Sequence, residues 1–134
     1  MGTDEDIERF LADWPEDANF SRDGFEQLYR YLQGLEGVEL EFHARPGITY
    51  SLRGVRSGST APLFAMVDVI DDQPRWLSVC FYEQMVTDPE GRGDSVPGGL
   101  LGEDGLCFDL DSDEAALIGY VRQRIGEAWQ ASGA

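Results

Sequence analysis

The stretch Leu63-Phe-Ala-Met-Val-Asp-Val-Ile70, followed by Arg75-Trp-Leu-Ser-Val-Cys-Phe-Tyr82, decides the fold of this chain. Both segments are rich in apolar, β-branched and aromatic residues, and only Asp71-Asp-Gln-Pro74 separates them. This pattern predicts two β-strands joined by a short connection. Because successive side chains of a strand point to opposite faces of a sheet, the residues of both strands fall into two sets.

One of the two sets is entirely apolar, and the other mixes apolar with polar residues. The apolar set is Leu63, Ala65, Val67, Val69, Leu77, Val79 and Phe81, and the mixed set is Phe64, Met66, Asp68, Ile70, Trp76, Ser78, Cys80 and Tyr82. Strands with apolar residues on both faces belong in the middle of a sheet. We therefore expect the apolar face to pack against helices. The mixed face is then left for a partner, for another part of the chain or for water.

Apolar residues at helical spacing predict three helices around these strands. The first begins near Thr3 and ends before Pro15, the second runs from Asn19 to Gln33, and the third runs from Asp111 to about Gln130. Residues 38–42 and 48–52 predict a hairpin whose apolar residues share a face only if its loop has an odd number of residues. Residues 106–110 predict a fifth strand.

The segment 87–105 contains six glycines and two prolines, which predicts an irregular segment. We expect its Val96, Leu100 and Leu101 to cover part of the mixed face and to leave a groove centred on Trp76. The chain as a whole predicts one α+β domain over residues 1–134. Its fold is a single antiparallel sheet of about five strands, with two N-terminal helices and one C-terminal helix mainly on one face.

The formal net charge of -16 is the most unusual global property of the chain. A negative field of this size opposes binding to nucleic acids and to anionic membrane surfaces, so neither is an expected partner. A basic segment of a protein partner would be attracted. The 10 basic residues are all arginines, which excludes Schiff-base chemistry and phosphate-binding lysines.

The potential metal ligands and nucleophiles are few. Cys80 and Cys107 have no metal-site spacing, and His43 is the only histidine. We therefore expect no metal site, no cofactor and no catalytic residues, and a non-enzymatic role is favoured. No signal peptide or transmembrane run is recognisable, which predicts a cytoplasmic protein with reduced thiols.

Two candidate binding sites from different functional classes remain. The first is the mixed face, with Trp76, Tyr82, Phe64, Met66 and Asp68, where Asp68 is expected opposite Ser78. Aromatic residues and methionine are enriched at interface centres, so this face predicts binding of a protein partner or of a second copy of the chain. The second candidate comprises Arg45, Arg53 and Arg56, which lie in a region without acidic residues from Phe42 to Val67. Arginine forks bind carboxylate or phosphate, so this cluster predicts a small anionic ligand, held by a binding protein or an enzyme.

Three runs of sequence carry a resemblance to a known family. They are Arg45-Pro-Gly-Ile-Thr-Tyr-Ser-Leu52, Asp68-Val-Ile-Asp-Asp72 together with Arg75-Trp-Leu77, and Val96-Pro-Gly-Gly-Leu-Leu-Gly102. With these runs the chain resembles an uncharacterised family of small acidic bacterial proteins over most of residues 25–130. The resemblance implies a bacterial, cytoplasmic, single-domain protein and assigns no activity or site residue. Small size and acidity are also similar to those of dimeric bacterial secretion chaperones, in composition alone.

Overall fold

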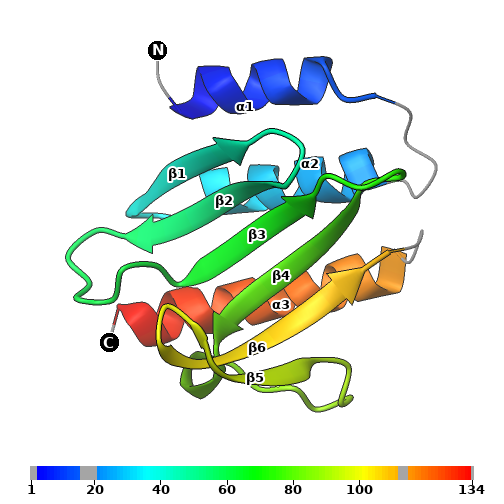
Figure 1. The fold of residues 1–134 in the computed structure, drawn as a ribbon. Coiled ribbons are helices and arrows are strands. Elements are labelled where there is room, and N and C mark those ends of the chain that lie inside the picture. The colour runs from blue at the N-terminus through cyan, green and yellow to red at the C-terminus, as the bar shows by residue number, and fades with distance from the viewer. Residues whose placement is uncertain (1–2, 16–20, 112–114, 134) are drawn as a thin grey trace.

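A computed structural model describes residues 3–15, 21–111 and 115–133 (Figure 1). Within these residues the chain forms one antiparallel sheet of six strands, together with three α-helices and a short 3₁₀ helix. The elements are α1 (Thr3–Ala12), α2 (Ser21–Gln33), β1 (Val38–Arg45), β2 (Thr49–Arg56), β3 (Ala65–Ile70), β4 (Trp76–Tyr82), η1 (Glu83–Met85), β5 (Asp94–Leu100), β6 (Glu103–Leu110) and α3 (Ala115–Ser132). The strand order is β1-β2-β3-β4-β6-β5, so the predicted α+β fold with an antiparallel sheet is confirmed.

The three helices pack on one face of the sheet. In Figure 1, α2 and α3 lie behind the strands and α1 runs beside β1 at the outer edge. The predicted apolar face provides the strand side of this core, and the buried strand residues are Ala65, Val67, Val69, Leu77, Val79 and Phe81. The helices contribute Ile7, Leu11, Phe25, Leu28, Val121 and Ile125, among others. The prediction that the apolar face meets helices is therefore confirmed from Ala65 onward, whereas Leu63 precedes β3 and packs instead in a small cluster with Tyr82 and Leu100. The predicted start of the second helix at Asn19 lies outside the described residues.

The β1–β2 hairpin follows the predicted parity. Arg45 pairs with Thr49, so the loop 46–48 has three residues, and Phe42 lies opposite Leu52. Gly47 has φ 84°, a backbone conformation that glycine adopts without a steric cost. Its N–H donates to Asp71 Oδ2 at 2.9 Å, which ties this loop to the β3–β4 connection. This contact fixes one end of the sheet.

Strand β5 corrects the prediction of an irregular segment at 87–105. It pairs with β6 at the edge of the sheet, with a register shift between Val96 and Leu100. Proline removes a backbone donor, which an edge strand tolerates because one side of its backbone faces no neighbouring strand. Pro97 and the adjacent glycines therefore fit an edge position, although their sequence reads as a loop. The sheet has six strands instead of about five for this reason.

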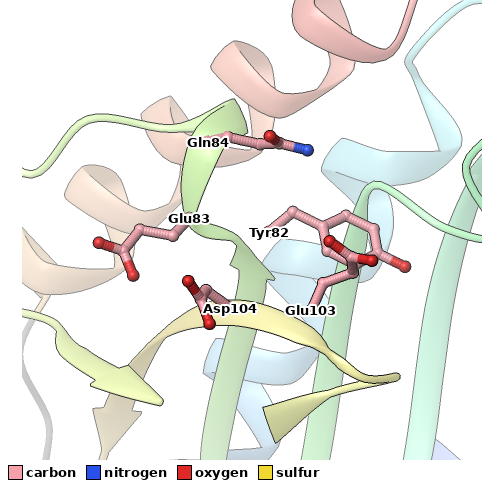
Figure 2. Close-up of a pocket in the computed structure, with 5 residues that line it drawn as sticks. All are labelled: Tyr82, Glu83, Gln84, Glu103 and Asp104. Atoms are coloured by element: carbon pink, nitrogen blue, oxygen red, sulfur yellow. The ribbon is translucent and has the colours of Figure 1, made fainter. Parts of the chain in front are cut away.

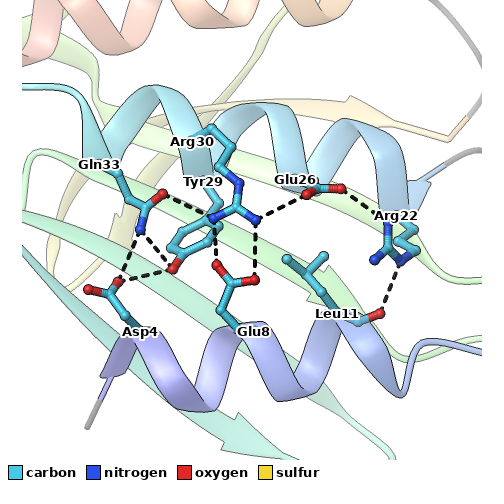
Figure 3. Close-up of polar contacts among 8 residues, drawn as sticks. All are labelled: Asp4, Glu8, Leu11, Arg22, Glu26, Tyr29, Arg30 and Gln33. Atoms are coloured by element: carbon cyan, nitrogen blue, oxygen red, sulfur yellow. Dashed lines mark hydrogen bonds and ion pairs between the residues drawn. The ribbon is translucent and has the colours of Figure 1, made fainter. Parts of the chain in front are cut away.

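Polar contacts join α1 to α2 (Figure 3). The Tyr29 hydroxyl donates to Asp4 Oδ1 at 3.0 Å, and the Arg30 guanidinium binds the carboxylates of Glu8 and Glu26. The Arg30 and Glu8 side chains are about half exposed, and exposed ion pairs of this kind stabilise a fold by about 0–1 kcal/mol. Burial of Ile7 and Leu11 therefore contributes more to holding α1 in place than the ion pairs do. No helix in the described part of the chain is long and apolar enough to cross a bilayer.

Candidate functional site

The face of the sheet opposite the helices is covered by none of the described helices (Figure 1). We call it the open face. Its centre is formed by Met66, Asp68 and Ile70 from β3 and by Trp76, Ser78 and Cys80 from β4. All of these except Cys80 are partly exposed, which matches the mixed set that alternation predicts. The open face is therefore the surface on which the sequence places a binding site.

A row of polar residues crosses the open face. The strand registers align His43 with Ser51, Ser51 with Asp68, Asp68 with Ser78 and Ser78 with Asp109. The predicted opposition of Asp68 and Ser78 is confirmed. Arg53 Nε donates to Ser51 Oγ at 3.2 Å, so a positive charge lies beside the middle of the row.

Asp68 is an unusual member of this row because one oxygen of its carboxylate is buried. Its Oδ1 atom has no hydrogen-bond partner among the residues that the structure describes. Burial raises the pKa of the Asp68 carboxyl, while the Ser51 hydroxyl and the charge of Arg53 lower it by less. A carboxylate kept in such a place costs stability, and functional sites are where proteins tolerate that cost.

We expect Asp68→Asn to stabilise the protein at pH 7. The folded-state pKa of Asp68 lies above the unfolded-state value, so stability falls as the pH rises through the raised pKa. Removal of the charge should raise the free energy of unfolding by about 1 kcal/mol at neutral pH, a typical cost of a buried unpaired polar group. The gain should shrink in acid, where Asp68 is already protonated. Urea unfolding at pH 7 and in acid measures it, and Glu39→Gln, which changes an exposed carboxylate, is the control. A loss of stability at pH 7 would contradict the prediction.

The apolar part of the open face is centred on Trp76. Trp76 lies opposite Ile70, and its Nε1–H donates to Asp72 Oδ2 at 2.8 Å. The preceding residue, Arg75, turns to the helix side, where its guanidinium lies 4.8 Å from the centroid of the Trp14 ring. Arg75 Nε also donates to Asp71 Oδ1 at 2.8 Å. These contacts anchor the strand end, so the Trp76 ring is held on the open face with its polar atom satisfied.

Phe64 and Tyr82 do not lie on the exposed surface where the mixed set placed them. Phe64 is 0% exposed, in the main core, and a Cβ atom on Gly54 would meet its ring at 3.0 Å. The assignment of Phe64 to the mixed face is wrong because strand geometry begins only at Ala65, so the alternation cannot be extended backwards. Tyr82 is on the open-face side but only 4% exposed, in a small cluster with Leu63 and Leu100.

Sequence analysis predicts that Val96, Leu100 and Leu101 cover part of the mixed face. In the structure only Leu100 does so, by packing in this small cluster. Leu100 is buried in it, whereas Val96 and Leu101 remain 37% and 55% exposed. The pairing of β5 with β6 explains the difference, because it holds the segment at the sheet edge and brings only its last residue over Tyr82. Trp76, six residues away on β4, is left partly exposed.

The three arginines of the second candidate site are not brought together. Arg53 lies on the open face beside Ser51, whereas the Arg56 guanidinium lies 4.2 Å from the centroid of the Trp129 ring and donates to the Trp129 carbonyl. Residues three apart on a strand face opposite sides, which separates Arg53 from Arg56. Arg45 pairs with Thr49, four residues from Arg53 and so about 13 Å along the sheet. They do not form one anion site.

Cys80 and Cys107 form a disulfide, which corrects the prediction of reduced thiols. They lie directly opposite each other on β4 and β6, on the open face and in the same row as Met66. Sequence analysis placed both cysteines in strands, but it did not predict that these two strands are neighbours. The disulfide therefore depends on a pairing that no local pattern reveals.

A pocket that no sequence pattern indicated lies at the end of β4 (Figure 2). It has a volume of about 410 Å³ and is lined by Tyr82, Glu83, Gln84, Glu103 and Asp104. Two short segments far apart in sequence, η1 and the start of β6, supply four of these residues. Three carboxylates thus line one pocket, although in the described part of the chain no group of histidine, cysteine and acidic residues is suited to hold a metal ion.

The fold and these two sites define a small acidic α+β protein with one helix-covered and one open sheet face. No protein-family model matches the sequence, and no curated protein or solved structure is significantly similar to it. The resemblance to an uncharacterised bacterial family therefore stays a prediction.

Proposed function

We propose that the protein is a non-enzymatic binding protein, and that its open face docks a basic segment of a protein partner. The observation that carries the proposal is the partly exposed apolar pair of Ile70 and Trp76, which lie directly opposite each other on a face that no described helix covers. A large aromatic residue beside aliphatic ones is typical of the centre of a protein interface. The Asp68 carboxylate lies two residues from Ile70 on the same face.

Charge complementarity favours a basic occupant. The strand positions on the open-face side carry more carboxylates than arginines: Glu39, Glu41, Asp68, Asp94 and Asp109 against Arg45 and Arg53. Burial raises the pKa of Asp109, and the nearby charges of Asp94 and Asp111 raise it further. A cationic segment would relieve this repulsion, and the net charge of -16 would accelerate its approach.

The enzymatic alternative has less support. Ser51, His43 and Asp68 are residue types of a hydrolytic triad and lie in one row. However, His43 Nε2 is 3.1 Å from Glu41 Oε1, and the Ser51 hydroxyl accepts from Arg53. A serine nucleophile of a triad is activated by a histidine base, and the His43 ring contacts Glu41 instead of Ser51. The separated arginines likewise weaken the alternative of a small anionic ligand. The cytoplasmic location stays a prediction, and the disulfide, typical of oxidising compartments, argues against it.

We expect Trp76→Ala to weaken binding far more than it lowers stability. The probes are two dye-labelled ten-residue peptides, one alternating arginine with leucine and the other alternating glutamate with leucine, titrated by fluorescence anisotropy. The basic peptide should bind, the acidic peptide should not, and Trp76→Ala should weaken binding about 30-fold or more, as truncation of an interface hot spot does. Leu101→Ala, which removes an exposed apolar side chain elsewhere, should bind like the parent.

Two results would contradict the proposed function. One is equal binding of the basic peptide by the parent and by Trp76→Ala, because contact would then depend on net charge alone. The other is a dimer in a concentration series by light scattering that Trp76→Ala dissociates, because a second copy of the chain would then occupy the open face.

A further inference from the structure

The two edge strands of the sheet differ in how well they are protected against further pairing. Strand β5, at one edge, contains Pro97 and two glycines, and its register against β6 shifts between Val96 and Leu100. Proline and an irregular register keep a sheet edge from pairing with another chain. Strand β1, at the other edge, has neither proline nor glycine and keeps an unbroken register with β2. The β1 edge therefore lacks these protections.

The backbone of β1 directs hydrogen-bonding groups outward at its even-numbered residues. On the side of β2, Arg45 O accepts a hydrogen bond from Ile48 N at 2.9 Å, and Gly37 O accepts one from Ser57 N at 2.8 Å. Along an antiparallel strand, residues alternate between bonding one neighbour and the other, so the odd-numbered residues of β1 bond β2. The residues left with outward N–H and C=O groups are Val38, Leu40, Phe42 and Ala44. Among the described residues no hydrogen bond reaches these outward groups.

The charges of β1 are complementary to a second copy of β1 in one register. Antiparallel self-pairing must set even-numbered residues opposite even-numbered ones, because these carry the outward groups. Two such registers overlap over seven of the eight residues of the strand. The first is centred on Glu41 and would oppose this carboxylate to its own copy. The second is centred on Phe42 and places both carboxylates of β1 opposite basic residues of the second copy, pairing Glu39 with Arg45 and Glu41 with His43.

We propose that two copies of the chain pair through their β1 edges, antiparallel and with a two-fold axis at Phe42. The two six-stranded sheets then form one continuous sheet. An isologous contact of this kind closes on itself, so it gives a dimer and no filament. Since opposed strand residues share a face, the two open faces lie on the same side of the dimer.

A hollow beside the β1 edge supports this proposal. It has a volume of about 440 Å³, and its lining includes Phe10, Phe42 and Ala44. Phe10 contacts the hairpin through its ring, 5.3 Å from that of Phe42, on the helix-covered face. Phe42 is only half-buried and Ala44 is exposed, although Leu52 on the same face is fully buried in the neighbouring strand. A second copy would cover these apolar side chains, which adds burial to the backbone pairing.

An exchange of charges tests the register. Sedimentation equilibrium of the parent should show a mass that rises with concentration from 14.9 kDa towards twice that value. Glu39→Arg alone and Arg45→Glu alone each set like charges opposite each other twice in the dimer, so each should weaken dimerisation about tenfold or more. The double variant restores opposite charges and should dimerise like the parent. Both residues are exposed, and all three variants should melt close to the parent curve.

The backbone contact is tested by Ala44→Pro. This variant removes an outward N–H that bonds nothing within the described chain, so it should remove the dimer and leave a folded monomer. Ala44→Ser keeps the N–H and is the matched control, which should dimerise like the parent. In the concentrated parent the Leu40 and Phe42 amides should exchange slowly with solvent, and dilution should speed their exchange. The Glu41 and His43 amides, which bond β2, should stay protected at both concentrations.

The proposal is overturned if the parent is monomeric at the highest soluble concentration, or if Ala44→Pro leaves a dimer intact. It is also overturned if Glu39→Arg strengthens dimerisation while Arg45→Glu weakens it, because the net charge of -16 would then govern association. Trp76→Ala should not change the dimer, and its dissociation by this variant would place the contact on the open face. Failure of the basic peptide to bind would leave the β1 dimer unaffected, so the two proposals fail separately.

Discussion

Val67→Asp should prevent the protein from folding. Val67 is 0% exposed and lies between Leu52 and Val79 in the three central strands, on the face that the helices cover. An aspartate there would have no basic partner in an apolar environment. A buried unpaired charge costs about 3–5 kcal/mol or more, a large part of the about 5–15 kcal/mol that stabilises a typical domain. Circular dichroism and a thermal melt should show no cooperative transition.

Ile70→Asp is the matched control for this prediction. Ile70 is in the same strand, three residues further on, and faces the open side, where it is partly exposed. The same substitution there should leave a cooperative melt. A melt for Val67→Asp close to that of the parent, or equal loss of structure in both variants, would contradict the assignment of faces on which the binding proposal rests.

Loss of the Cys80–Cys107 disulfide is expected to be the second large effect on stability. The bond joins residues 27 apart in sequence, and a cross-link that closes a loop of this length restricts the unfolded chain. The chain-entropy model gives about 3.5 kcal/mol for such a loop, which corresponds to a fall of about 10 °C in the melting temperature of a domain this size. Thermal melts with and without dithiothreitol measure the difference.

The double variant Cys80→Ala and Cys107→Ala is the control for the reductant. It should melt near the reduced parent, and dithiothreitol should not change its curve. Mass spectrometry after alkylation of the denatured protein checks the bond directly, because the unreduced chain should take up no label and the reduced chain two. Two labels without prior reduction would contradict the disulfide, and the thiols would be free as sequence analysis predicted.

The division of the central strands into two faces was predictable from sequence. Alternation is a local property, so Val67 and Val79 could be placed against the helices, and Asp68 opposite Ser78, without knowledge of any distant segment. The odd-length loop 46–48 followed from the same parity. The rule failed at Phe64, one residue before β3, because alternation holds only where the backbone is a strand. The partly exposed position of Trp76 on the open face could also be predicted in this way, as could that of Met66 on the same face.

The features that only the tertiary structure decided depend on contacts between segments far apart in sequence. Strand β5 forms from Pro- and Gly-rich sequence because β6 offers it an unpaired edge, and no propensity scale contains that neighbour. The pairing of β4 with β6 brings Cys80 to Cys107, and the turn before β6 brings Glu103 and Asp104 to Tyr82. Sequence by itself determined which residues share a face. The order of the strands determined the disulfide and the carboxylate pocket, because both are made by residues that become neighbours only when the sheet assembles.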